Sequence, residues 1–221
     1  MRSGYAARFF RLNVGLLLYA LGLVFCIHAN IGLAPWDAFA IGIAKQMNTT
    51  FGMASIWSSI AILFLVVYLK EKIGVGTVLN GLLIGLWADL IRNTRLIPYM
   101  QSLPSGVLML WLGQFVVSFA TYFYITSAMG SGPRDSLMVG LCKKFPHRPV
   151  GLIRGCIEGA VLLIGWALGA KVGVGTVIAV AGIGFIIQIT FKMLSFDVKS
   201  VKHENVFETL RNLFGRETKV Q

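Results

Sequence analysis

The feature that most constrains this chain is a set of long apolar runs without charge. Residues 51–69 and residues 105–129 contain no Asp, Glu, Lys or Arg. A hydrocarbon core about 30 Å thick needs roughly 20 apolar residues in a helix, so each run can cross a bilayer. Only 13% of the residues are charged and 56% are hydrophobic, whereas a soluble domain carries roughly 25% charged residues. The sequence therefore predicts an all-α polytopic membrane protein.

Six segments are long enough to span the membrane and two are too short. The predicted spans are residues 12–30, 51–69, 73–91, 105–129, 150–170 and 172–191. Pro35–Met47 and Pro133–Phe145 would each be about 20 Å long as helices, which does not cross. We predict them to be half-helices buried against the spans, since irregular backbone at membrane depth must be surrounded by protein or water. If they cross fully, the chain has eight spans.

The chain contains two copies of one pattern, about 98 residues apart. Residues 32–37 (GLAPWD) align with residues 130–135 (GSGPRD), and residues 74–78 (GVGTV) recur unchanged as residues 173–177. We predict a first membrane repeat at 1–100, a second at 101–194 and a cytoplasmic amphipathic tail at 195–221. Three crossings per repeat would invert the second repeat relative to the first, which is a recurrent transporter design. Eight spans would make the repeats parallel.

Loop charges predict that both termini are cytoplasmic, because cytoplasmic loops carry an excess of Lys and Arg. The six-span model counts nine basic residues inside and four outside, and the eight-span model counts nine and three. Charge counting therefore does not separate the two models. The basic N-terminal residues before the first span imitate a signal peptide, but that span has a counterpart in mid-chain, so we expect it to be retained.

The GLAPWD and GSGPRD segments, together with the paired GVGT segments, resemble the YczE/YyaS/YitT family of bacterial integral membrane proteins. The similarity extends to about Met193 and is closest to the YczE-like members. It implies a multi-pass protein of the bacterial inner (cell) membrane with a suspected role in transport. It implies no enzymatic chemistry.

The acidic residues inside apolar segments are the candidate functional residues. Asp37 and Asp135 each follow a proline by two positions at the start of a half-helix, where a carboxylate favours the helix dipole. The functional alternative is that the two helix starts converge on one central site. An acid at the bilayer centre costs on the order of 3 kcal/mol. These carboxylates should therefore face the protein interior or water.

Four further charged residues complete the predicted substrate or ion path. Arg134 is either a cytoplasm-edge residue or the partner of Asp37, Asp89 or Glu158, or of an anionic ligand. Arg154 and Glu158 lie four residues apart, so an intrahelical ion pair is the favoured interpretation. Asp89 lies near the end of its span and is either interfacial or part of the path.

The glycines of the paired segments are predicted to make tight turns or close helix contacts. They are Gly32, Gly74, Gly76, Gly130, Gly173 and Gly175. Thr77 and Thr176 are candidate lining hydroxyls. The GVGT segments lack the spacing and the lysine of a phosphate-binding loop. No His, Cys or acid has metal-ligand spacing, so we expect neither a metal nor a cofactor.

Two functions follow from these patterns. The first is a secondary transporter or permease for a small solute, for instance an anionic one. The second is a non-transporting membrane protein that regulates or scaffolds a cytoplasmic partner through the tail. We expect no enzyme, because no nucleophile–base pair is visible. The net charge of +11 lies mostly between apolar runs, so the expected surroundings are a lipid bilayer and not nucleic acid.

Overall fold

The computed structural model describes residues 2–196, 201 and 203–214, and every regular element in these residues is a helix. The helices are α1 (Arg2–His28), α2 (Pro35–Gln46), α3 (Phe51–Tyr68), α4 (Val75–Asn93), α5 (Leu103–Thr126), α6 (Pro133–Lys144), α7 (Val150–Ala167), α8 (Val174–Met193) and α9 (Val206–Phe214). Six of them, α1, α3, α4, α5, α7 and α8, are long and apolar enough to cross a membrane. The predicted all-α fold with six long apolar helices is confirmed.

The helix boundaries follow from local chemistry. α2 and α6 both begin at a proline, which suits the first helical turn because its missing N–H has no partner there. The Thr50 side chain caps α3 by accepting a hydrogen bond from the Met53 amide. Each half-helix has 12 residues and is therefore only roughly 18 Å long. α1 begins about ten residues before the predicted span, because Arg8 and Arg11 do not interrupt the helix.

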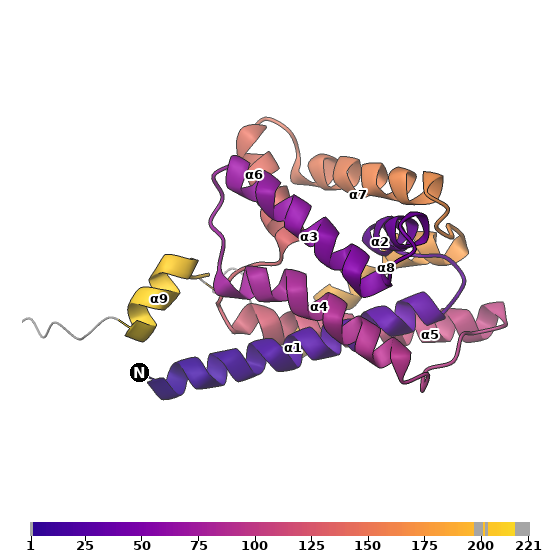
Figure 1. The fold of residues 1–221 in the computed structure, drawn as a ribbon, viewed down its shortest axis with the longest axis horizontal. Coiled ribbons are helices and arrows are strands. Elements are labelled where there is room, and N and C mark those ends of the chain that lie inside the picture. Colours follow the sequence, from indigo (N-terminus) through magenta and orange to yellow (C-terminus); the bar gives the residue numbers. More distant parts are fainter. Residues whose placement is uncertain (1, 197–200, 202, 215–221) are drawn as a thin grey trace, which may run out of the picture.

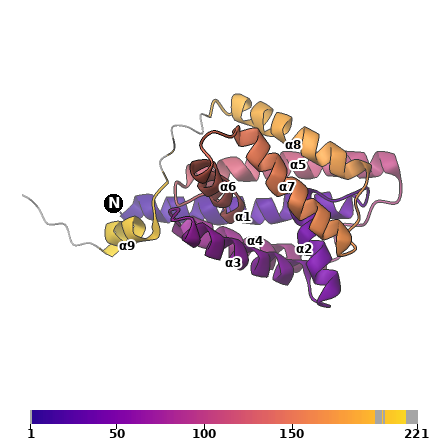
Figure 2. The same ribbon diagram turned by 90° about the horizontal axis from the view of Figure 1, so that it is seen from above.

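Two long helices form the centre of the molecule. α1 packs along α5, and α4 and α8 pack against α1 and α5 respectively. α2 packs against α7 and α3, and α6 packs against α3 and α7. Each half-helix thus contacts a long helix from the other half of the chain. α6 lies nearer the end of the molecule that holds α9, and α2 lies nearer the opposite end (Figures 1 and 2).

The paired motifs bind each other across the two halves. The Gly76 amide donates to the Met129 carbonyl at 2.7 Å, and the Gly175 amide donates to the Ile31 carbonyl at 2.9 Å. In both cases a GVGT segment of one half meets the residue just before the GLAPWD or GSGPRD segment of the other half. The same connection is therefore made twice, and it links the two half-helices to the starts of α4 and α8.

The two threonines cap their own helices. The Thr77 hydroxyl accepts from the Gly74 amide at 3.1 Å, and the Thr176 hydroxyl accepts from the Gly173 amide at 3.2 Å. Both side chains are buried, and neither lines the basic cavity at the end opposite α9 or the three small cavities described below. The structure gives both hydroxyls a role as helix caps. Each hydroxyl thus satisfies a backbone amide at the start of its helix.

One end of the molecule holds residues that the six-span model places on the same side of the membrane. Asn30, Lys45, Arg92 and Lys171 line one cavity at one end. In an eight-span chain, Lys45 and Arg92 would lie across the membrane from Asn30 and Lys171. In the described structure these four residues lie at the same end of the molecule.

The C-terminal segment docks at the end that holds the N-terminus (Figure 1). The Glu204 amide donates to the Ala128 carbonyl and the Val206 amide to the Ile73 carbonyl, both at 3.0 Å. The Glu204 carboxylate accepts from the Arg8 guanidinium at 2.7 Å and from the Tyr5 hydroxyl at 3.0 Å. α9 is an amphipathic helix within the predicted tail. Of its predicted apolar residues, Val206, Phe207 and Leu210 have described side chains, whereas those of Leu213 and Phe214 lie outside the described set.

Tail docking should depend on pH through Glu204. Partial burial opposes ionisation, but hydrogen bonds from Arg8 and Tyr5 outweigh it and hold the pKa of this carboxyl below its ordinary value of 4.5. A carboxyl with a lowered folded-state pKa contributes stability above the unfolded value, and that stability is lost as pH falls through the folded value. We expect docking to be constant from neutral pH to about pH 5 and to weaken below pH 4.5.

Fluorescence anisotropy of a dye on cysteine at Asn212, in a background without the three native cysteines, measures this docking. Anisotropy should fall in acid. The Glu204→Gln variant should show lower anisotropy at neutral pH and a smaller response to acid. An unchanged acid response in Glu204→Gln would assign the pH dependence to other carboxyls.

Candidate functional site

Three small cavities meet in the interior between the two half-helices. Their volumes are about 60, 130 and 120 Å³, and Tyr19 and Arg134 line all three. Tyr19 comes from the middle of α1, and Arg134 is the second residue of α6. One water occupies about 30 Å³ in the liquid, so each of the two larger spaces accommodates a solute of a few heavy atoms. We refer to the three spaces together as the central cavity.

Arg134 is the cation of the central cavity. Its guanidinium lies over the Trp36 ring, 5.0 Å from the centroid, and the flat guanidinium is suited to stacking on an aromatic face. Among the described residues it forms no ion pair with Asp37, Asp89 or Glu158. The predicted side-chain partner is thus replaced by Trp36, the residue that aligns with Arg134 in the first repeat. The charge is half-buried and faces the cavity without a direct counter-ion.

Asp135 lines the same cavity beside Arg134. Its carboxylate accepts a hydrogen bond from the Tyr124 hydroxyl at 3.1 Å. Tyr124 contacts Tyr19 edge to face, with 6.3 Å between ring centroids. Tyr19 and Tyr124 therefore connect α1 and α5 to the start of α6. Asp135 itself is among the exposed residues, so it is open to solvent or solute.

Asp37 lies on the other side of Arg134. It is 3% exposed and lines the cavity of about 130 Å³ with Arg134 and Glu158. Its Oδ1 atom has no hydrogen-bond partner among the described residues. A buried carboxylate oxygen without a partner is costly, so Asp37 is suited to bind a proton, a cation or a donor group of a ligand.

Arg154 and Glu158 form one wall of the central cavity. The Arg154 Nε atom donates to Glu158 Oε1 at 2.9 Å, four residues along α7. This ion pair is the one predicted from the spacing. Because each residue neutralises the other, the pair permits two charges in an apolar helix. Arg134 is consequently the cation left for a ligand.

Asp89 does not belong to this group. It lies near the end of α4, where its Oδ1 atom accepts from the Gly52 amide at 2.9 Å. It lines a separate, larger cavity at the opposite end of the molecule from α9. The structure thus brings together Asp37, Arg134, Asp135, Arg154 and Glu158 and leaves Asp89 apart. Its local role is to bind the first turn of α3, where a carboxylate is favoured.

Three uncharged polar residues of the site were missed by the sequence reasoning. Tyr19 and Tyr124 lie inside spans, although tyrosine is typical of membrane interfaces. Gln114 is buried in α5, lines the cavity beside Asp37 and donates to the Ala179 carbonyl at 3.2 Å. The signal that could have identified them is a hydrogen-bonding side chain near the centre of a span, which a search for charges passes over.

The described residues hold no group of three or more His, Cys, Asp or Glu side chains placed to bind a metal. The central cavity instead offers one free cation, two carboxylates and two tyrosines. Such a set recognises a small polar solute through charge-assisted hydrogen bonds.

The fold and the cavity define a class: a multi-span α-helical membrane protein with a charged cavity between two half-helices. A family model described as "Family of unknown function (DUF6198)" matches residues 6–192, and the chain belongs to this family. The match covers all six long apolar helices except the first four residues of α1 and the last residue of α8.

Curated relatives agree with this assignment. An "Uncharacterized protein" of Haemophilus influenzae is 32% identical over 83% of this chain and 85% of its own length. The "Uncharacterized membrane protein YczE" of Bacillus subtilis is 27% identical over 79% and 80%. The "Uncharacterized protein YyaS" of the same species is 24% identical over 80% and 89%. The resemblance to YczE and YyaS is confirmed, and no solved structure gives a significant match.

Proposed function

We propose that this protein is a secondary transporter that carries a small polar solute through the central cavity. The observation that carries the proposal is the convergence of the two half-helix starts on one charged cavity. Half-helices that meet near the bilayer centre are a recurrent way to bind solutes and coupling ions. Arg134 binds an anionic group of the solute, Asp135 and Tyr124 orient it, and Asp37 exchanges the coupling proton or cation.

A closed layer of side chains favours a carrier over an open pore. Ile27 and Leu33 line the large cavity at the end opposite α9, while their chain neighbours Cys26 and Ala34 line the central cavity. Both Ile27 and Leu33 are buried. One layer of apolar side chains therefore separates the two spaces. A carrier opens such a layer only after the opposite side has closed.

The inverted arrangement of two repeats belongs to the same proposal, with both termini in the cytoplasm of a bacterial cell. It is supported by the duplicated contacts of the GVGT segments and by the position of the half-helices near opposite ends of the molecule. Inverted repeats supply two related conformations, because each half adopts the form of the other when the site opens to the opposite side.

Cysteine accessibility in intact cells tests this topology. We expect single cysteines at Leu69 and His147 to react only from the cytoplasm and one at Asn93 to react only from outside. The six-span arrangement requires this pattern because α2 does not cross, so that α3 runs from the outside to the cytoplasm and α4 runs back to the outside. Labelling of position 69 from outside would show eight spans and would remove the argument from inverted repeats.

Solute uptake into proteoliposomes tests transport itself, with a panel of radiolabelled organic acids, inorganic phosphate and amino acids. At least one solute should accumulate, and its uptake should be lost when Arg134 or Asp135 is replaced. If no solute of the panel accumulates although the protein is correctly inserted, the second function, regulation of a cytoplasmic partner, is favoured. The observation behind that alternative is α9, whose Phe207 side chain is 82% exposed.

A further inference from the structure

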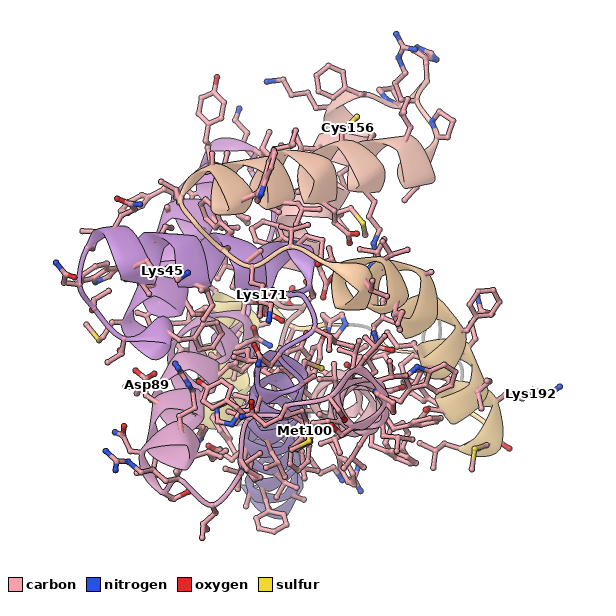
Figure 3. The ribbon with its side chains drawn as sticks, turned by 90° about the vertical axis from the view of Figure 1, so that its right-hand side faces the viewer. Lys45, Asp89, Met100, Cys156, Lys171 and Lys192 are labelled. Carbon is pink, nitrogen blue, oxygen red and sulfur yellow. The ribbon has the colours of Figure 1, made fainter. Side chains whose placement is uncertain are left out.

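A much larger cavity lies outside the central cavity. It has a volume of about 1120 Å³ and lies at the end of the molecule opposite α9. The ends of α1, α2 and α4, the start of α3 and the loop between α7 and α8 surround it. Figure 3 looks onto this end, with Lys45, Asp89 and Lys171 around one part of the face. We refer to this space as the basic vestibule.

The vestibule is lined by four cations and one acid. The cations are Lys45, Arg92, Arg95 and Lys171, and the acid is Asp89. The carboxylate of Asp89 already binds the Gly52 amide at the start of α3. The vestibule therefore has an excess of positive charge, and charged walls that enclose a cavity concentrate ions of the opposite sign.

The two lysines are fixed at the rim, which leaves the two arginines for a ligand. The Lys45 amine donates to the Gly169 carbonyl and the Lys171 amine to the Asn30 carbonyl, both at 2.5 Å. Among the described residues, Arg92 makes one long hydrogen bond, 3.4 Å, from Nη2 to the Tyr99 hydroxyl, and its guanidinium lies 5.9 Å from the centroid of the Phe51 ring. Its buried Nε atom has no partner among the described residues.

His28 gives an independent sign of a ligand. It lines the vestibule and is 3% exposed. Its Nδ1 atom lies 2.8 Å from the Ile97 carbonyl, and a carbonyl can only accept, so Nδ1 carries the hydrogen. Nε2 is then a free acceptor and has no partner among the described residues. Tyr99 stacks on the ring, with 3.9 Å between centroids, and holds its orientation.

We propose that the basic vestibule binds an oxyanion that keeps one O–H group, namely hydrogen phosphate or a phosphate monoester. Arg92 and Arg95 bind the charged oxygens, and the ligand's remaining O–H donates to His28 Nε2. Hydrogen phosphate keeps an O–H at neutral pH, and a phosphate monoester keeps one in its singly protonated form, which predominates below its second pKa of about 6. The charged oxygens of both are strong acceptors. Sulfate has the charge but no proton to donate. This site goes beyond the proposed transport function and does not depend on it.

Equilibrium binding to the purified full-length protein in detergent tests the proposal without any transport assay. Calorimetric titrations with sodium phosphate and sodium sulfate are compared at constant ionic strength. We expect phosphate to bind and sulfate to bind at least tenfold more weakly. The Arg92→Gln, Arg95→Gln double variant should bind phosphate at least tenfold more weakly than the wild type. Lys192→Gln, an exposed cation on α8 outside the vestibule, is the matched control and should bind as the wild type does.

The His28→Phe variant keeps a ring to stack on Tyr99 and removes the acceptor. It should lose the preference for phosphate over sulfate. The unliganded thermal midpoints show whether each variant is folded. The proposal is overturned if phosphate and sulfate bind the wild type equally, if the double variant binds phosphate normally, or if Lys192→Gln weakens binding as much.

Nanodiscs distinguish a free ion from a lipid headgroup. Phosphatidic acid carries a phosphate monoester, whereas phosphatidylcholine does not. If phosphatidic acid in the disc competes with phosphate in the wild type but not in the double arginine variant, the ligand is the headgroup. If phosphate binds equally in both kinds of disc, the ligand is the free ion. Both results support the oxyanion site. Competition that persists in the double variant contradicts it.

Discussion

Replacing Arg134 with alanine is expected to reduce solute uptake by about 100-fold while the protein still inserts and folds. The guanidinium faces all three spaces of the central cavity and makes no ion pair among the described residues. A hydrogen bond to a charged group contributes about 1.5–3 kcal/mol, which corresponds to roughly a tenfold to 150-fold change for each interaction lost. Because the alanine variant loses both the charge and the contact with Trp36, the upper part of this range is expected.

Lysine at position 134 separates the two contributions. Arg134→Lys keeps the charge but lacks the flat guanidinium that stacks on Trp36, so uptake should be intermediate. Arg148→Ala removes an exposed arginine from the loop between α6 and α7 and should leave uptake unchanged. These rates are measured in proteoliposomes at equal protein density. Normal uptake in Arg134→Ala would exclude the central cavity as the solute site.

The second large effect is expected from Gly130→Ala, which should destabilise the fold by on the order of 2–4 kcal/mol. Gly130 has φ = +126°, a conformation that side chains with Cβ rarely adopt. An added Cβ would also lie 2.5 Å from the Thr77 hydroxyl and 2.8 Å from the Gly74 Cα atom. The loop before α6 would have to move away from the start of α4, which breaks the contact between the two halves.

The thermal midpoint and the monodisperse yield in detergent measure this loss. Since net stabilities of proteins are about 5–15 kcal/mol, this loss is a large part of the total and should lower both the thermal midpoint and the yield of the Gly130→Ala protein. Gly184→Ala is the matched control, because an added Cβ there has no neighbour within 4 Å and alanine is a better helix former than glycine. Equal stability of the two variants would contradict the role of Gly130 in the close contact between the loop before α6 and the start of α4.

The local features of the fold could be predicted from the sequence. The uncharged runs predicted the long helices because crossing a bilayer requires a fixed number of apolar residues in succession. Proline at 35 and 133 marked the starts of the half-helices to the residue. The Arg154–Glu158 pair was also predictable, since residues four apart on a helix are neighbours. In each case, the interacting residues are close in the chain, so the helical geometry determines their positions.

Only the tertiary structure decided which distant residues share a site. Asp37 and Arg134 are almost a hundred residues apart, and the packing of α2 and α6 against the long helices of the other half brings them to one cavity. The same packing leaves Asp89 at the far end, in the vestibule with His28. Tyr19 and Gln114 line the central cavity because α1 and α5 turn the faces that carry these residues toward it. The sequence by itself determined where the helices lie and which charged residues fall within them, because both depend on local, additive energies. The cavities arise from non-local packing that no single segment encodes.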